Sequence, residues 1–428
     1  MRHAVRRIYL LALIQLTFLA ACGGSGGGLL GGTGGTGGTG GTGGSGQTIA
    51  SAAANVVQMS VDAGPAGVGA NTTFNIPYIS VTICAPGSTT NCQTIDHIEV
   101  DTGSYGLRVI SSVLNSAIFS GLPQEATSAN VPIVECTQFG DGFSWGSLRL
   151  ADVTISGEKA ASVPMQVMGD PNYPTIPTAC SSTGAEEDTV ALFGANGILG
   201  VGPFVQDCGT ACTSSTQYGL YYACPTGGGT CSPTFVLLSQ ETANPVATFT
   251  TDNNGVIVEL PSVADAGAIT ATGALVFGIG TQANNGLGSA TVLTTDDTGE
   301  ISITYNNVAY PTSFIDSGSN LNFIDPGSVT VCGTSPNQLL CPSTEISTSA
   351  TPVGVNGTQS TVKFNIGDAT TLFNNNPSFT AFNNVAAPSS DPLKKTFDFG
   401  LPFFYGRNVF TAIQGMNTAG GMGPYFAY

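Results

Sequence analysis

Two short segments decide the fold: IEVDTGS at residues 98–104 and SFIDSGS at residues 313–319. In each segment, apolar residues typical of a β-strand lead directly into an aspartate, a hydroxyl residue and a glycine. This pattern predicts that Asp101 and Asp316 lie in tight turns at the ends of buried strands. A buried carboxylate is costly unless it is hydrogen-bonded or functional. One such loop in each half of the chain therefore predicts a pseudo-symmetric site built from both halves.

A third Asp-Thr-Gly tripeptide, at residues 297–299, has a different setting. It follows the polar residues 294–296 and precedes Glu300. Asp and Gly are common turn residues. We therefore interpret this copy as a polar hairpin tip without a chemical role.

With its two apolar aspartate loops the chain resembles the pepsin family of aspartic peptidases. In that family two aspartates share one proton and activate one water molecule, without a histidine, a metal or an organic cofactor. The resemblance implies that Asp101 and Asp316 are the catalytic pair and that no cofactor and no metal is bound. Like charges held close together cannot both ionise easily, so such a pair titrates in two separated steps.

The resemblance also assigns supporting roles to the three residues after each aspartate. The first hydroxyl of each loop matches a residue that reaches the backbone of the opposite loop and holds the two loops together. The glycines match positions where the backbone approaches the carboxylates closely, and the last hydroxyls match residues that hydrogen-bond the aspartates. These residues are Thr102, Gly103, Ser104, Ser317, Gly318 and Ser319. We expect Ser319 to help keep Asp316 ionised and the activity optimum acidic.

Each lobe of that family also has an apolar strand ending in glycine behind its aspartate loop. GILGVG at residues 197–202 is similar to the first of these strands. DFGLPFF at 398–404, followed by NVFTAI at 408–413, is similar to the second strand with its short helix and closing strand. GALVFG at 273–278 resembles the strand that opens the second lobe.

The remaining sequence also indicates a mainly β protein. Short β-branched and aromatic runs are broken by Gly, Pro, Asn and Asp, and long amphipathic helical stretches are absent. We predict a bilobal pepsin-like acid protease fold, with two pseudo-symmetric β-barrel-like lobes at residues 55–245 and 246–428 and a cleft between them. At the boundary, residues 244–246 (Asn-Pro-Val) resemble a motif of an uncharacterised family of bacterial lipoproteins, which implies no activity. Pro245 is expected to fix the crossing between the lobes.

The substrate-covering flap should lie between Asp101 and Gly200. Its tip is similar to the family's at Phe139, Gly140, Asp141 and Gly142. Phe139 replaces the usual flap tyrosine, and Arg108 replaces the tryptophan that is that tyrosine's hydrogen-bond partner. Trp145, the only tryptophan, is either a substrate contact or part of the core.

The N-terminus predicts export. Residues 1–21 carry arginines, then a short apolar run that ends in Leu-Ala-Ala before Cys22, which is typical of a lipoprotein signal peptide. Residues 22–54 are predicted as the lipidated cysteine and a Gly/Thr/Ser-rich tether. Because Gly23 is not aspartate, the resemblance to sorted lipoproteins implies the outer membrane of a Gram-negative cell. We expect a cell-envelope protein facing the periplasm or the cell surface, attached to the membrane only by its lipid.

Charge and histidine content exclude several classes of protein. The net charge is −17, and few basic residues argue against nucleic acid as a partner. Of the two histidines, His3 lies in the signal peptide, so a Ser-His-Asp or Cys-His mechanism would depend on His97 alone. We interpret His97 as structural and expect a monomer.

Cysteine usage predicts structural disulfides. Of the eleven cysteines, an even number remains without Cys22, in a compartment that permits disulfides. Irregular spacing and the lack of ligand histidines disfavour a metal site. Four pairs are close in sequence, and elimination gives the fifth. The predicted pairs are Cys84–Cys92, Cys136–Cys180, Cys208–Cys212, Cys224–Cys231 and Cys332–Cys341.

Three functions remain open. The first is an aspartic-type endopeptidase at the cell envelope, which hydrolyses peptide or protein substrates with water activated by Asp101 and Asp316. The second is a catalytically silent protein of the same fold that binds extended peptides or glycans in its cleft; the altered flap favours it. The third, a β-rich adhesin, explains the composition but leaves the paired loops to chance.

Overall fold

The computed structural model describes residues 47–69, 72–226, 229–335, 337–391 and 393–428. The predicted signal peptide, Cys22 and the tether up to residue 46 lie outside the described residues. Within the described ranges, none of the helices is both long enough and apolar enough to cross a membrane.

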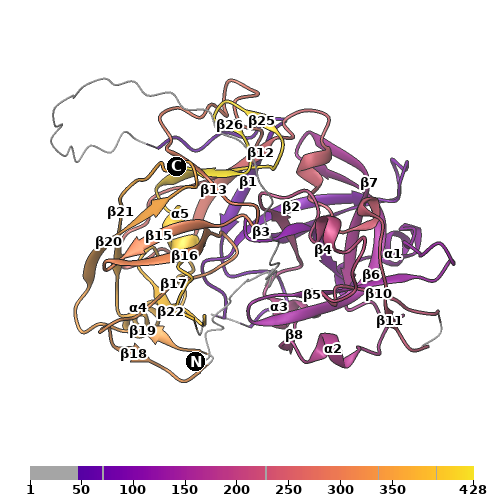
Figure 1. Ribbon diagram of the computed structural model, residues 1–428, viewed down its shortest axis with the longest axis horizontal. Helices are drawn as coiled ribbons and strands as arrows, with labels where there is room; N and C mark the ends of the chain where they lie inside the picture. The colour runs from indigo at the N-terminus through magenta and orange to yellow at the C-terminus, as the bar shows by residue number, and fades with distance from the viewer. Residues whose placement is uncertain (1–46, 70–71, 227–228, 336, 392) are drawn as a thin grey trace, which may run out of the picture.

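The chain forms two β-rich lobes, which lie side by side in Figure 1 with the first lobe in indigo to magenta and the second in orange to yellow. β1 (Val56–Val61) lies between them. The strands of the first lobe are β2 (Pro77–Cys84), β3 (Cys92–Asp101), β4 (Tyr105–Ile110), β5 (Ile133–Gln138), β6 (Gly142–Ile155), β7 (Glu158–Met168), β8 (Ala185–Glu186), β9 (Gly197–Val201), β10 (Tyr221–Ala223) and β11 (Ser232–Pro233).

The second lobe contains many short strands. They are β12 (Gly255–Leu260), β13 (Ala271–Phe277), β14 (Val292–Thr294), β15 (Ile301–Tyr305), β16 (Val308–Ile315), β17 (Asn322–Ile324), β18 (Val331–Cys332), β19 (Leu339–Leu340), β20 (Ile346–Val353), β21 (Val362–Ile366), β22 (Ala386–Pro388), β23 (Asp398–Phe399), β24 (Arg407–Ala412), β25 (Asn417–Thr418), β26 (Gly421–Met422) and β27 (Tyr425–Ala427).

Helices are short and lie in the connections. The α-helices are α1 (Ser116–Gly121), α2 (Thr178–Ser181), α3 (Val190–Phe193), α4 (Ala369–Asn375) and α5 (Leu401–Phe404), and the 3-10 helices are η1 (Ser111–Val113), η2 (Gly209–Ala211), η3 (Leu238–Gln240) and η4 (Pro245–Thr248). The alternation of side chains explains the strands between them. In β15, for example, Ile301, Ile303 and Tyr305 are buried, while Thr304 between them is exposed.

One 16-stranded sheet runs through both lobes. Its order is β11-β10-β5-β6-β7-β4-β9-β3-β2-β1-β13-β12-β24-β27-β14, with β8 paired to β6. β1 joins the lobes because it pairs with β13 over residues 56–61 and with β2 at Ser60 and Val61. A second sheet, in the order β21-β20-β15-β16-β23-β17-β22, belongs to the second lobe alone.

The same local strand pattern surrounds both aspartate loops. In the first lobe, β9 lies between β3, to which it is parallel, and β4, to which it is antiparallel. In the second lobe, β23 lies between β16, to which it is parallel, and β17, to which it is antiparallel. In each case a strand that is directly followed by a glycine lies between the two strands that flank an Asp-hydroxyl-Gly loop. This repeated topology confirms the predicted mainly β, two-lobed, pepsin-like fold class.

A single large apolar core supports both loops. Its buried members include Val100 and Leu199 in the first lobe and Ile315 and Phe399 in the second. The five predicted disulfides are present with the predicted pairing. The packed part of the chain begins inside the segment predicted as tether, since the side-chain amide of Gln47 donates to Asn408 Oδ1 at 2.9 Å.

Candidate active site

The two loop aspartates have matching positions and matching hydrogen bonds. Asp101 is the last residue of β3, and Asp316 directly follows β16. Both are fully buried. The backbone N–H of Gly103 donates to Asp101 Oδ1 at 2.7 Å, and that of Gly318 donates to Asp316 Oδ1 at 2.8 Å. Each loop therefore holds its carboxylate by a hydrogen bond to its own glycine.

The hydroxyls after the aspartates connect the two loops, as the resemblance implied. Thr102 Oγ1 accepts a hydrogen bond from the Ser317 backbone N–H at 2.9 Å and donates to the Ile315 carbonyl at 3.2 Å. Ser317 Oγ makes the reciprocal contacts: it accepts from the Thr102 backbone N–H at 3.1 Å and donates to the Val100 carbonyl at 2.7 Å. We call these four hydrogen bonds the interlobe grip. They fix the relative position of the two aspartate loops.

The grip brings the carboxylates close together. A Cβ atom added to Gly103 would lie 2.6 Å from Asp316 Cγ, so only glycine fits at this position. Burial raises the pKa of Asp316 well above its usual value, and the neighbouring charges of Asp101 and Asp398 raise it further. The site therefore favours a proton on Asp316.

The outer hydroxyls differ between the two loops. Ser319 Oγ donates to Asp316 Oδ2 at 2.9 Å, as expected. A hydrogen bond of this kind favours the ionised form of Asp316, whereas burial and the charges of Asp101 and Asp398 raise its pKa. Ser104 is fully buried, and its hydroxyl forms no hydrogen bond with any described residue. Asp101 Oδ2 likewise receives none from the described part of the chain.

The predicted flap is a β-hairpin. Its strands β5 and β6 pair from Val134↔Ser147 to Gln138↔Phe143, and the Phe139 N–H donates to the Gly142 carbonyl at 2.7 Å across the turn. In Figure 1 the turn of this hairpin points toward the second lobe. Gly142 also pairs with Ala185 of β8.

The Phe139 side chain is anchored in the first lobe. It is buried and packs against Phe193, with a ring-centroid distance of 5.8 Å. The same apolar cluster contains Ile198 of β9, the strand behind Asp101. Apolar packing of Phe139 therefore holds the turn of the flap, at the position where the resemblance to the pepsin family implies a tyrosine.

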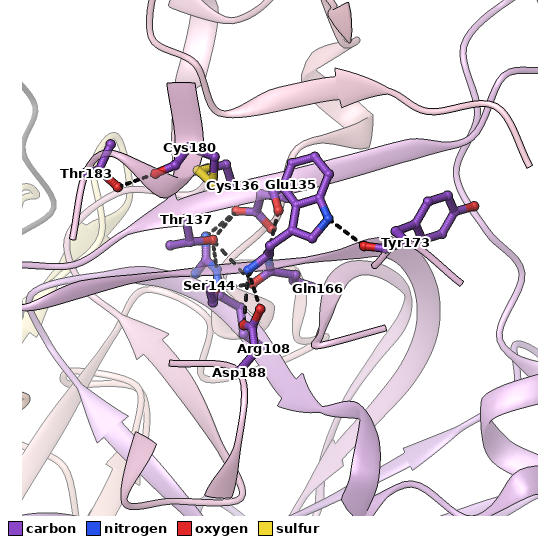
Figure 2. The surroundings of a disulfide bond; sticks show 11 residues. Arg108, Glu135, Cys136, Thr137, Ser144, Gln166, Tyr173, Cys180, Thr183 and Asp188 are labelled. Atoms are coloured by element: carbon purple, nitrogen blue, oxygen red, sulfur yellow. Dashed lines mark hydrogen bonds and ion pairs between the residues drawn. A yellow bond between two sulfur atoms is a disulfide. The ribbon is translucent and has the colours of Figure 1, made fainter. Parts of the chain in front are cut away.

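Arg108 forms a buried polar network that joins β4 to the flap strand. Its Nη2 atom donates to Glu135 Oε1 at 2.6 Å and to Asp207 Oδ2 at 3.0 Å, and its Nε donates to Thr137 Oγ1 at 2.8 Å. Its Nη1 donates to the carbonyl of Tyr105, in the chain just after the first aspartate loop. Figure 2 shows Arg108, Glu135 and Thr137 together near the Cys136–Cys180 disulfide. Arg108 thus forms an ion-pair network at the position where the resemblance to the pepsin family implies a tryptophan.

Two other expectations are resolved by the structure. Trp145 is part of the core: it is buried, its Nε1 donates to the Tyr173 carbonyl at 2.9 Å, and its ring packs edge-on against Tyr222. The alternative of a substrate contact at Trp145 was wrong, because its indole points into this core. His97 lies within β3, and its side chain is partly exposed. Its Nε2 atom lies 3.3 Å from Asp62 Oδ1.

The third tripeptide forms a turn between β14 and β15, as predicted for residues 297–299; Asp297 and Thr298 are exposed there and Gly299 is buried. The following residue has a role that we did not foresee. Glu300 lies close enough to Tyr105 to raise the pKa of that phenol, after the larger effects of burial and of the Asp101 and Asp316 charges. The turn of the second lobe lies beside Phe204 of the first lobe, whose ring packs edge-on against Tyr105.

Sequence reasoning missed three buried acidic residues near the site: Glu135, Asp207 and Asp398. Glu135 shares one strand face with Thr137, two residues further along. Together with an arginine in the apolar run at residues 107–110, this spacing could have indicated a polar network. Asp398 lies in a segment, residues 398–404, whose other residues are apolar. A charged residue in such a segment was the available indication of a special role. We find no comparable sequence indication for Asp207.

Comparisons with known proteins identify a family and a similar solved structure. A family model described as "Protein of unknown function (DUF3443)" matches residues 51–428. Among solved structures, the chain is similar to an aspartic proteinase from Irpex lacteus, with 16% sequence identity and a TM-score of 0.47, over 87% of this chain and 96% of that chain. A comparison with curated proteins found no match.

Proposed function

We propose that this chain, which belongs to the family described as "Protein of unknown function (DUF3443)", is an aspartic-type endopeptidase. The observation that carries the proposal is the pair of buried carboxyls, Asp101 and Asp316, held together by the interlobe grip. Structural ion-pair networks normally place a base beside buried acids. Here two acids face each other instead, which is the arrangement that general acid-base catalysis by one shared proton requires.

The proposed reaction uses the two protonation states of the pair. The ionised carboxylate accepts a proton from a water molecule, whose oxygen attacks the peptide carbonyl carbon. The protonated carboxyl, which the raised pKa of Asp316 favours as the holder, donates its proton to the carbonyl oxygen. The C–N bond of the tetrahedral diol then breaks: the amine nitrogen takes the proton that the first carboxylate received from water, a diol hydroxyl gives its proton to the other carboxylate as the C=O bond re-forms, and the pair again holds one proton. We propose that the β5–β6 hairpin covers the substrate, with residues 139–142 at its tip.

The location of the protein in the cell is also part of the proposal. Acylation of Cys22 and the tether would attach the lobes to the outer membrane, where peptides or proteins of the envelope are the substrates. Five disulfides agree with an oxidising compartment. We propose a monomer that touches the membrane only through its lipid and needs no metal or organic cofactor.

A binding protein without turnover is the second candidate function. The observations that favour it are the complete burial of Asp101 and Asp316 and the apolar anchoring of Phe139. A peptide must reach the carboxyls before it can be cut, so the hairpin must move away from the second lobe. If it does not, the cleft can only hold a ligand outside the pair.

Digestion of a mixed peptide library across pH separates the two candidates. The wild type should cut peptides with a bell-shaped pH dependence on the acid side, because only the singly ionised pair is active. Asp101→Asn and Asp316→Asn should each abolish cutting, and the double variant should be little worse, since the pair acts as a unit. Turnover that survives either substitution contradicts the mechanism. A folded wild type that binds library peptides and leaves them intact supports the binding protein.

A further inference from the structure

Phe74 and Asn75 belong to the first half of the chain, but both are buried against the second lobe. They lie just before β2. The Phe74 ring packs edge-on against Phe382, with a ring-centroid distance of 6.4 Å. It shares an apolar cluster with Leu321, the residue before β17. This segment therefore reaches the part of the second lobe that directly follows the Asp316 loop.

Asn75 uses both ends of its side-chain amide in the second lobe. Its Nδ2 donates to the Asn320 carbonyl at 3.0 Å and to the Phe382 carbonyl at 2.9 Å. Its Oδ1 accepts from the Phe382 backbone N–H at 2.8 Å and from the Tyr405 hydroxyl at 2.9 Å. A primary amide has two N–H donors and an oxygen with two lone pairs. The Asn75 side chain is therefore fully paired.

The backbone at Asn75 also suits asparagine. Its φ of 51° lies in the left-handed region, where asparagine occurs more often than most other residues. The residue has no exposed surface. Both the backbone conformation and the four side-chain hydrogen bonds thus fit the residue type at this position.

The carbonyl that Asn75 holds has a counterpart in the first lobe. Asn320 and Tyr105 are each the fourth residue after the aspartate of their loop. The Tyr105 carbonyl accepts a hydrogen bond from Arg108 Nη1 at 2.6 Å. A side-chain N–H donor therefore holds the equivalent carbonyl in both lobes, from Arg108 in the first lobe and from Asn75 in the second.

The preceding carbonyl of each loop is held by backbone N–H groups of the same lobe. The Ser104 carbonyl accepts from the Gly202 N–H at 2.9 Å, and the Ser319 carbonyl accepts from the Leu401 N–H at 2.7 Å. These donors lie just after β9 and β23. The second loop differs from the first because its next carbonyl, that of Asn320, depends on a side chain from outside its own lobe.

We propose that Asn75 is a positioning residue of the second aspartate loop. Its amide fixes the Asn320 carbonyl and thereby the adjacent Ser319, whose hydroxyl donates to Asp316 Oδ2 at 2.9 Å. Without the amide, the carbonyl loses this donor inside the protein, and the loop shifts toward a new partner. The effect on turnover rests on the proposed peptidase, whereas the effect on the loop does not.

Two substitutions remove the N–H donors of Asn75 in different ways. Asn75→Gly removes the whole side chain, and glycine adopts a positive φ without strain. Asn75→Asp keeps the shape and the acceptor oxygen, and its ionised form, which pH 8 favours, donates no hydrogen bond. Each variant tests the inference if the other fails to fold.

Asn254 provides the matched control, because it is a buried asparagine of the second lobe with similar hydrogen bonds. Its Nδ2 donates to the Ile279 and Asn417 carbonyls at 3.1 and 2.9 Å, and its Oδ1 accepts from the Ile279 N–H at 2.8 Å. None of these partners belongs to an aspartate loop. Tyr405→Phe is a second control, since it removes one hydrogen bond to Asn75 Oδ1 and leaves both bonds from Nδ2.

Hydrogen exchange followed by mass spectrometry at pH 8 tests the positioning role without turnover. In the full chain with Asn75→Gly or Asn75→Asp, the amides of residues 316–321 should exchange at least about tenfold faster than in the wild type, because local opening of the loop becomes easier. The amides of β4, which follows the first loop, should keep the wild-type rate. The same substitutions at Asn254, and Tyr405→Phe, should leave both segments unchanged. Wild-type exchange of residues 316–321 in the Asn75 variants, or equal acceleration in both segments, overturns the inference.

The kinetic test rests on the proposed function. Asn75→Gly should lower kcat for peptide cutting about tenfold and change KM less than about twofold, because the loss falls on the alignment of the reacting carboxyls. Asn254→Gly should keep the wild-type kcat. Wild-type kcat in a folded Asn75→Gly contradicts the positioning role. A wild type that cuts no peptide, together with the expected exchange pattern, supports the held loop and refutes the proposed peptidase.

Discussion

Thr102→Val tests whether the interlobe grip holds the two lobes together. Valine has the shape of threonine without the hydroxyl, so the substitution removes two hydrogen bonds and leaves the packing. The Ser317 N–H and the Ile315 carbonyl lose their partner at 2.9 and 3.2 Å. An unpaired buried polar group costs about 1–3 kcal/mol. We expect the free energy of unfolding to fall by about 2–4 kcal/mol, since both groups lie in the dry contact between the loops.

Urea unfolding provides the measurement, and the chain supplies its own control. Fluorescence of Trp145, the only tryptophan, reports on the first lobe, and far-UV circular dichroism reports on both. Thr298→Val makes the same change in the Asp-Thr-Gly copy at residues 297–299, where the exposed threonine hydroxyl donates to Asp296 Oδ1 at 2.7 Å. This control should change stability by less than about 0.5 kcal/mol. Thr102→Val that is as stable as Thr298→Val would refute the grip as a source of interlobe stability.

Three further predictions concern other parts of the molecule. Arg108→Met should destabilise the first lobe by about 3–5 kcal/mol in urea unfolding, because Glu135 and its neighbours lose their buried cation; unchanged stability contradicts the ion-pair network. Burial raises the pKa of Glu241 to about 8 from its usual 4.5, so the folded state holds a proton that the unfolded state releases, and stability should fall as the pH rises between these values. In Glu241→Gln the free energy of unfolding should fall less steeply with pH than in the wild type. Equal slopes for the wild type and the variant contradict the raised pKa of Glu241. Cys22→Ser should abolish labelling by a radioactive fatty acid in cells; persistent labelling excludes the lipoprotein assignment.

The general fold and the paired loops could be predicted because they depend on local sequence. An apolar strand that runs into Asp-hydroxyl-Gly has few structural interpretations, and its presence in both halves indicated the symmetry. Disulfides between near neighbours, such as Cys84 and Cys92, follow from spacing alone. The packing of Trp145 could not be predicted, because its surroundings come from segments at residues 173 and 222 that the local pattern does not connect.

The chemistry around the pair was harder to predict because it depends on tertiary contacts. Arg108 departs from the family pattern, yet its partners Glu135 and Asp207 lie 27 and 99 residues away. Asp398 was included in a matching motif by its neighbours Phe399 and Gly400, so its charge was overlooked. Ser319 contacts Asp316 as the resemblance implies, but the charges of Asp101 and Asp398, which raise the pKa of Asp316, come from segments that the local sequence does not connect.

The position of β1 between the lobes has a consequence for how the chain folds. Val56 pairs with Val276, so the first strand cannot complete its pairing until more than half of the chain is available. The Thr102–Ser317 bond closes a separation of 215 residues. Contacts so distant in sequence make folding slow, because the entropy of closing each loop is lost before the contact stabilises the structure. The pairing of β1 with β13 and the interlobe grip are therefore expected to form late, once residues of both lobes are available.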